Sequence, residues 1–385
     1  MRERHLIFLV PGFFGFARLG DLMYFHYVQQ ALEAEWARHG LQVTVVPVET
    51  HPTASILRRG QRLLDTILSS PWEQADAIHL LGHSTGGLDA RVLASPRIQL
   101  TPEHRRQQVL KKLRTIVTLS TPHHGSPIAG FFTTAYGKNL LQLLSLLTAR
   151  ASGEVSAGAV SLGFKLVNRF QGRLGLNDTL LNQLSEQLLE DFNGERRAAL
   201  LSYTRQIRED QGALLQLTPE GMHLFNALLP PPEGIGCYSI INAAPPPKRT
   251  PPMEATVNPR VAIGYVLYRF MWDTVAEHHR AYPYAQVSAP ARERLEQQLR
   301  LSLDSETSDG VVPTLSMAWG KCVGAVRGDH LDVVGHFGKP RGMTQFADWL
   351  RSGAGFGETH FIALYRQISR LMMEGEQAGM PELLD

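Results

Sequence analysis

Short apolar runs alternate with helical patterns along the first third of the chain, and this alternation restricts the fold more than any other feature. Four brief runs rich in Val, Ile and Leu lie at residues 5–10, 43–48, 77–81 and 113–119. Such continuous apolar runs are typical of parallel strands buried on both faces. Helical spacing is found between them, at residues 24–39, 56–68 and 88–93. We therefore predict βαβ units and a doubly wound, mostly parallel α/β sheet.

The alternation breaks after Ser126, and the chain is mainly helical up to about residue 235. The piece "NLLQLLSLLTAR" is apolar around most of its circumference, which is more than one packed face requires. A new strand-like run, "CYSIINA", follows the closing segment "LLPPPEG". We predict a helical cap or lid at 127–235, inserted into a core formed by 1–126 and 236–385. Either the rest of the insertion buries this apolar surface permanently, or it forms a lid. If a lid opens, Leu144 would contact substrate and the cap would touch a lipid surface transiently.

The composition excludes some classes of partner. A chain of 385 residues with 43% hydrophobic residues can bury a large core. Lys and Arg total 38 against 36 Asp and Glu, without a long run of like charge, so nucleic acid is not an expected partner.

The chain has two cysteines, Cys237 and Cys322, which we expect to be buried free thiols. A disulfide between them is the alternative. The oligomeric state is not indicated.

The amino terminus has the outline of an export signal, with a basic start and a short apolar run. It lacks a small-residue cleavage site, and Pro11 and Gly12 end the run early. We interpret it as the first strand. No other apolar run reaches the roughly 20 residues of a membrane span, so we expect a soluble, cytoplasmic protein.

The stretch "HLLGHSTGG" places Ser84 in the pattern G-x-S-x-G, between an apolar strand and a helical pattern. Small glycines permit the sharp strand-to-helix turn that exposes a serine hydroxyl. A serine hydroxyl is a poor nucleophile at neutral pH, so it needs a histidine base and an acid that orients this histidine. The sequence therefore predicts Ser84 as a nucleophile if such partners exist.

Candidates for these partners lie near the carboxyl end, in the chain order serine, acid, histidine. "SETSDGVVP" offers Asp309 on a tight turn, with Asp304 as the rival acid. "RGDHLDVVGHF" offers His330 and His336, of which we take His330 as the base. His83 directly precedes the serine, and we expect it to be a packing residue because adjacent side chains diverge on so tight a turn.

An oxyanion hole would need two fixed N–H donors. The residue after the nucleophile, Thr85, supplies the first through its backbone N–H. The segment "VPGFFGF" is expected to supply the second, because Gly12 lets the backbone approach and Phe13 N–H can point at the site. Phe13 and Phe14 are expected to present an apolar wall to the substrate. In "STPHHGSP", we expect His123 and His124 to brace their loop, with lining of the pocket as the alternative.

These motifs, together with "LTPEGMHLFN", "DHLDVV" and "LYRQISRL", resemble those of the bacterial triacylglycerol lipases of the α/β-hydrolase fold, over nearly the whole chain. The resemblance implies Ser84, Asp309 and His330 as the catalytic triad and a mobile helical lid over an acyl pocket. It also implies Phe13 and Thr85 as oxyanion donors. We predict a serine hydrolase of acyl esters, with medium or long chains preferred. Rival interpretations are an acyltransferase, a phospholipase or a polyester depolymerase with the same triad, and a noncatalytic binding protein.

Two features depart from this resemblance. Pro11 stands where the family usually has a histidine before the glycine. Family members often bind a structural calcium through an aspartate two residues after the catalytic histidine, which Asp332 matches. The second calcium aspartate has no counterpart, because residues 242–272 contain no aspartate. A hard cation needs several oxygen ligands, so we predict a protein without a cofactor and keep calcium open.

Overall fold

The structure is a computed structural model. It describes residues 3–13, 18–19, 22–134, 201–202, 205–207, 209–248, 250, 253, 259–277, 284–285, 287–338, 348 and 350–374.

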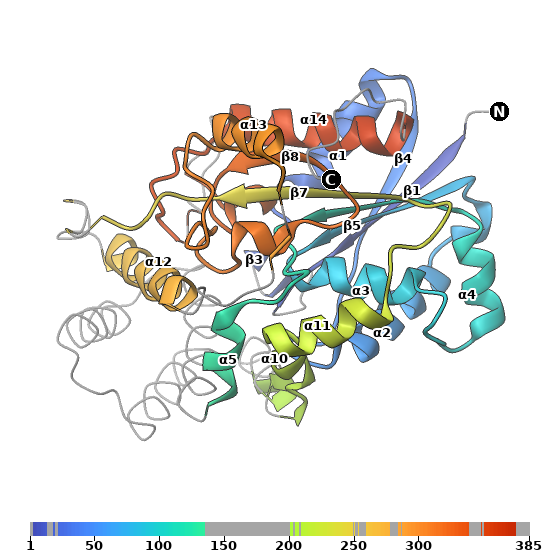
Figure 1. Cartoon of the computed structure of the whole chain (residues 1–385). Coiled ribbons are helices and arrows are strands. Elements are labelled where there is room, and N and C mark those ends of the chain that lie inside the picture. Colours follow the sequence, from blue (N-terminus) through green and yellow to red (C-terminus); the bar gives the residue numbers. More distant parts are fainter. Residues whose placement is uncertain are drawn as a thin grey trace.

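A parallel sheet of six strands runs through the molecule (Figure 1), in the order β4-β1-β5-β6-β7-β8. The strands are β1 (Arg4–Val10), β4 (Gln42–Pro47), β5 (Ala77–His83), β6 (Leu113–Leu119), β7 (Gly236–Ala243) and β8 (Lys321–Arg327). The predicted parallel sheet is confirmed. Because parallel strands end at one edge, the residues that follow β5, β6, β7 and β8 are brought to the same side of the molecule. A separate antiparallel pair joins β2 (Arg18–Leu19) and β3 (Leu22–Met23).

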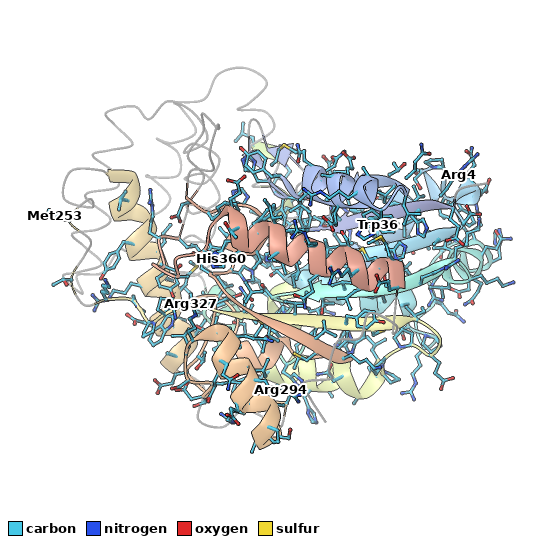
Figure 2. All side chains as sticks on the ribbon, turned by 90° about the horizontal axis from the view of Figure 1, so that it is seen from above. Arg4, Trp36, Met253, Arg294, Arg327 and His360 are labelled. Carbon is cyan, nitrogen blue, oxygen red and sulfur yellow. The ribbon has the colours of Figure 1, made fainter. Side chains whose placement is uncertain are left out.

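Helices cover both faces of the sheet (Figure 1). On one face α1 (Val28–Arg38) and α14 (Glu358–Glu374) lie side by side, as the view from above shows (Figure 2). On the other face lie α2 (Ile56–Leu68), α3 (Thr85–Ala94) and α11 (Pro219–Leu228). The remaining helices are α4 (Glu103–Leu110), α5 (Pro127–Thr133), α10 (Gly212–Gln216), α12 (Pro259–Glu277) and α13 (Ala289–Leu299), with short 3-10 turns at Trp72–Gln74, Thr314–Met317 and Asp332–Val334.

The side chains of β1 show why a continuous apolar run predicts a strand buried on both faces. Ile7 and Leu9 belong to the core cluster that includes α1 and α14. Leu6, Phe8 and Val10 alternate with them and belong to the cluster that includes α2 and α3. Alternate residues of a strand point to opposite faces, so a strand covered by helices on both sides is apolar throughout.

The two ends of the predicted insertion pack against the hydrolase core. Ala129 of α5, Leu217 after α10 and Met222 of α11 are buried in the same cluster as Leu88 of α3. The central part of the insertion, with Leu144, lies outside the described residues, so the predicted lid stays a prediction.

Both cysteines are buried and free, as expected. Burial raises the pKa of the Cys237 thiol to about 12 and that of Cys322 to about 11. In the part of the chain that the structure describes, no helix is both long enough and apolar enough to cross a membrane.

Candidate active site

Ser84 lies on a strained turn between β5 and α3. Its backbone has φ 53° and ψ −131°, a combination that residues other than glycine rarely adopt. The backbone N–H of Ser84 donates to the carbonyl of Leu119 at the end of β6 (2.9 Å), which fixes the turn to the sheet. The side chain is buried, at 5% exposure. This geometry is that of a nucleophile elbow, in which strain directs one hydroxyl out of the strand end.

Glycines allow the backbone to approach this serine closely. A Cβ added to Gly12 would lie 2.5 Å from the Cβ of Ser84 and 3.0 Å from its Oγ, so the loop after β1 passes directly over the serine side chain. A Cβ on Gly86 would collide with the carbonyl of Val10 at the end of β1. Any larger residue at either position would push the loop or the helix away from Ser84.

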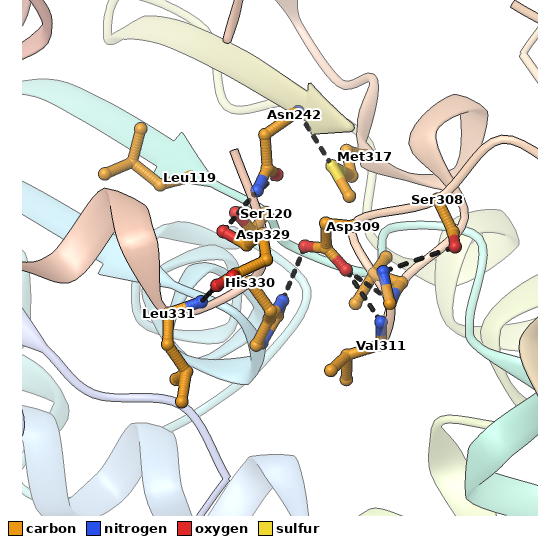
Figure 3. A network of polar contacts seen from close by, with 12 residues as sticks. Leu119, Ser120, Asn242, Ser308, Asp309, Val311, Met317, Asp329, His330 and Leu331 are labelled. Carbon is orange, nitrogen blue, oxygen red and sulfur yellow. Dashed lines mark hydrogen bonds and ion pairs between the residues drawn. The ribbon is translucent and has the colours of Figure 1, made fainter. Parts of the chain in front are cut away.

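Asp309 and His330 are paired at the same edge of the sheet (Figure 3). Nδ1 of His330 lies 2.6 Å from Oδ2 of Asp309, and the backbone N–H of His330 donates to the carbonyl of Asp309 (3.1 Å). The other carboxylate oxygen accepts the N–H groups of Val311 (2.9 Å) and Val312 (2.7 Å). Gly310 adopts φ +92°, which this tight turn requires. Asp309, which is fully buried, is therefore fixed as an acceptor for the imidazole.

His330 also lies beside the turn that carries the serine. The rings of His83 and His330 have centroids 4.7 Å apart, and Nε2 of His83 lies 2.9 Å from the carbonyl oxygen of His330. His83 is the neighbour of Ser84 in the chain. The structure thus places the predicted pair of His330 and Asp309 beside the turn that carries Ser84.

A buried amide fixes the loop that carries His330 (Figure 3). Nδ2 of Asn242, at the end of β7, donates to the carbonyls of Gly328 (3.4 Å) and Asp329 (3.2 Å). Its Oδ1 accepts the hydroxyl of Ser120 at the end of β6 (2.6 Å). Ser120 has φ 51°, so this residue too is strained at the strand end. Asn242 was not predicted from the sequence. Only its position near the end of a strand-like apolar run could have pointed to a role at the site.

The rival candidates have other partners. Asp304 is exposed, and its Oδ1 accepts the N–H groups of Glu306 and Thr307 within its own turn. Nε2 of His336 donates to the carbonyl of Tyr24 (3.0 Å), and burial lowers the pKa of His336 to about 4. His123 is buried, and its Nδ1 lies 3.2 Å from Nη1 of Arg91.

The predicted oxyanion donors lie on two sides of Ser84. Thr85 is the first residue of α3, and N–H groups in the first turn of a helix have no acceptor within the helix. Phe13 follows Gly12 in the loop that passes over the serine. Phe14, predicted as an apolar wall, lies outside the described residues, as does Leu144.

An ion pair that was not predicted from the sequence supports the loop after β1, which contains Gly12. The guanidinium of Arg59 on α2 donates from Nη2 to the carbonyls of Pro11 (2.8 Å) and Gly12 (3.1 Å). The same group binds both carboxylate oxygens of Asp89 on α3, at 2.8–3.1 Å. Both side chains are completely buried. Within the helical pattern of residues 56–68, nothing distinguished Arg59 from an exposed arginine.

The carboxyl oxygens of Asp332 and Asp329 accept hydrogen bonds from neighbouring groups of the protein. Oδ2 of Asp332 accepts the backbone N–H of Asp329 (2.9 Å), whose own Oδ2 accepts the hydroxyl of Ser352 (2.8 Å). Burial, with the carboxyl of Asp348 nearby, raises the pKa of Asp329 to about 7. Among the described residues, no three His, Cys, Asp or Glu side chains gather as a group that could bind a metal ion. We therefore derive no step from calcium.

Comparison with known proteins finds similarity to serine esterases and lipases. A family model described as "Putative serine esterase (DUF676)" matches residues 1–154. The amino-terminal part of the chain is therefore similar to a family of serine esterases. A triacylglycerol lipase of Pseudomonas fragi is 31% identical over 137 residues, which cover 35% of this chain and 41% of that protein. A triacylglycerol lipase of Vibrio cholerae is 35% identical over 129 residues, or 33% and 36% of the two chains. The chain thus spans about two fifths of the length of these curated relatives.

Solved structures of bacterial lipases share the fold. Lipase 1 from Pelosinus fermentans matches with a TM-score of 0.50 at 17% identity, covering 97% of this chain and 100% of that one. A lipase from Staphylococcus hyicus matches with a TM-score of 0.50 at 14% identity, covering 98% and 97%. The predicted α/β-hydrolase fold is confirmed.

Proposed function

We propose that the protein is a serine carboxylic ester hydrolase that cleaves acyl esters through an acyl-enzyme intermediate. The observation that carries this proposal is the bond between His330 and Asp309 beside the strained turn of Ser84. The pair and the serine lie at the carboxyl edge of the sheet, and a histidine–carboxylate pair next to a serine is what makes a serine hydroxyl nucleophilic. The similarity of residues 1–154 to serine esterases supports the same chemistry.

In this mechanism Ser84 Oγ attacks the ester carbonyl carbon while Nε2 of His330 accepts the hydroxyl proton. The carboxylate of Asp309 accepts a hydrogen bond from the Nδ1–H of His330, which fixes the tautomer and stabilises the imidazolium that forms. The carbonyl oxygen becomes an oxyanion, which the backbone N–H groups of Thr85 and Phe13 stabilise. His330 then returns its proton to the departing alkoxide, and the alcohol leaves.

The second half of the reaction repeats these steps with water. His330 deprotonates the water as it attacks the acyl carbon, and a second oxyanion forms in the same place. Collapse of this intermediate returns the proton to Ser84 Oγ and releases the fatty acid. We propose medium or long acyl chains, and the naming of both curated relatives as triacylglycerol lipases makes triglyceride a substrate to test.

The test compares wild type with Ser84→Ala on p-nitrophenyl esters from acetate to palmitate and on emulsified triglyceride. We expect hydrolysis by the wild type and less than a few per cent of this rate in the variant, with an unchanged melting temperature. A fluorophosphonate probe should label the wild type alone. Substantial hydrolysis by Ser84→Ala, or a wild type that neither hydrolyses esters nor reacts with the probe, would contradict the proposal.

A further inference from the structure

A chain of hydrogen bonds crosses the site from the loop after β1 to the loop that carries His330. The backbone N–H of Gly12 donates to the hydroxyl oxygen of Tyr24 (2.8 Å). This hydroxyl lies 2.7 Å from Nδ1 of His83, and Nε2 of His83 lies 2.9 Å from the carbonyl oxygen of His330. Tyr24 is 6% exposed and His83 is completely buried, so solvent does not compete for these bonds.

The groups at the two ends of this series of hydrogen bonds determine which atom donates in each bond. The N–H of Gly12 can only donate, and the carbonyl of His330 can only accept. The Tyr24 oxygen therefore accepts from Gly12 and donates its own proton to Nδ1 of His83, which carries its proton on Nε2. Burial, with His330 nearby, lowers the pKa of His83 well below its usual range, in agreement with a neutral ring.

This assignment leaves His83 without a free nitrogen. Both of its ring nitrogens are engaged, so it cannot take the proton of the adjacent Ser84. The ring instead connects the loop after β1, through Tyr24, to the loop that carries His330. A Cβ on Gly12 would lie 2.5 Å from both the Tyr24 hydroxyl and the Cβ of Ser84, so both groups lie close against Gly12.

We propose that Tyr24 and His83 are positioning residues for ester hydrolysis, which set the distance between the oxyanion loop at Gly12 and Phe13 and the base His330. This role rests on the proposed function. The transition state needs the oxyanion donors and the base in place at the same time, and a misplacement of about 1 Å can cost roughly 100-fold in rate. Ground-state binding of the ester depends much less on this distance.

The test is Tyr24→Phe, which removes the hydroxyl and keeps the ring. We expect kcat to fall about 10-fold to 100-fold while KM changes less than about 3-fold. A trifluoromethyl ketone, which forms a tetrahedral oxyanion with an active serine, should lose affinity by a similar factor. Tyr365→Phe is the matched control, because its buried hydroxyl donates to the carbonyl of Val333 (2.8 Å) and does not touch the oxyanion loop. This control should lower the melting temperature and leave kcat unchanged.

His83→Asn interrupts the same series of hydrogen bonds at another point, and it tests the proposal if Tyr24→Phe does not fold. It should lower kcat by a similar factor. The double variant should lose no more than the worse single variant, because both interrupt one chain, whereas independent effects would multiply.

Fluorophosphonate labelling separates the possible failures. A labelled, active wild type whose kcat is unaffected by Tyr24→Phe and His83→Asn would overturn the positioning role alone. Equal losses of kcat in Tyr24→Phe and the Tyr365→Phe control would overturn it as well. A wild type that is neither labelled nor active would overturn the proposed function, and the positioning role with it.

Discussion

Replacement of Arg59 by methionine tests whether a buried ion pair supports the oxyanion loop. In the variant the carboxylate of Asp89 stays completely buried and loses its charged partner. Removal of one partner from a buried pair typically costs about 3–5 kcal/mol of stability. A chain of 385 residues has an unfolding entropy of about 0.8 kcal/mol/K, so the melting temperature should fall by roughly 4–6 °C.

Arg59 also donates to the carbonyls of Pro11 and Gly12, so the same variant should lower activity. The double variant Arg59→Met/Asp89→Leu separates the two effects. It removes the unpaired charge, and stability should recover by half or more, because an apolar pair of similar volume can replace a buried ion pair. Activity should not recover, since neither new side chain can donate to the loop.

The assays are thermal unfolding and kcat on a soluble p-nitrophenyl ester. Arg106→Met is the matched control, because Arg106 is equally buried and donates to the carbonyls of Leu93 and Ser95 at the far end of α3. It should lower the melting temperature and leave kcat unchanged. The reasoning would be refuted if Arg59→Met melted within about 1 °C of wild type, or if the double variant recovered activity together with stability.

Four further predictions follow from the site and the core. Asp309→Asn should lower kcat by roughly 10⁴-fold, far more than Asp304→Asn, and the reverse order would identify the wrong acid. Burial lowers the pKa of His79 in the folded state to about 3. Below pH 6.5 the unfolded state therefore binds a proton on this imidazole that the folded state does not bind, and the free energy of unfolding falls as the pH falls. The stability gap between wild type and His79→Gln should therefore narrow by about 2 kcal/mol from pH 7 to pH 5 in urea titrations, and an equal gap at both pH values would contradict this. EDTA should leave the melting temperature unchanged, whereas a shift reversed by calcium would show a bound cation. Leu144→Glu should lower activity on emulsified long-chain esters more than on soluble acetate esters, and equal losses with a lowered melting temperature would point to fixed core instead.

The central strands could be predicted from the sequence because both of their faces are buried. The run at 77–81 became β5, which is buried along its whole length, and the run at 113–119 became β6 with one exposed residue. No continuous apolar run in the sequence predicted β8. Its sequence "KCVGAVR" carries cations at both ends and a glycine in the middle, and as an edge strand it is only half buried. Edge strands need fewer apolar residues, so periodicity alone does not predict them.

The predicted triad could be located because its chemistry restricts residue types and chain order, whereas its supporting residues obey no such rule. Arg59 and Asp89 are 30 residues apart, and Asn242 binds a loop 86 residues away. An arginine in a helical pattern is usually exposed, and only the packing of α2 against α3 buries this one. We predicted that His83 is a packing residue. It is buried, but its hydrogen bonds depend on Tyr24, which is distant in sequence.

The buried residues that support the loops of the site share one property, which is the kind of group to which they donate hydrogen bonds. Arg59, Asn242 and His83 all donate to main-chain carbonyls of the loops and not to their side chains. The position of each loop is therefore set by its backbone, and the loop side chains remain available to contact substrate. Because these donors are buried and already bonded, the oxyanion donors and the base need no rearrangement when charge develops. In the proposed mechanism, substrate preference can then depend on residues such as Phe13 without disturbing the positions of Ser84 and His330.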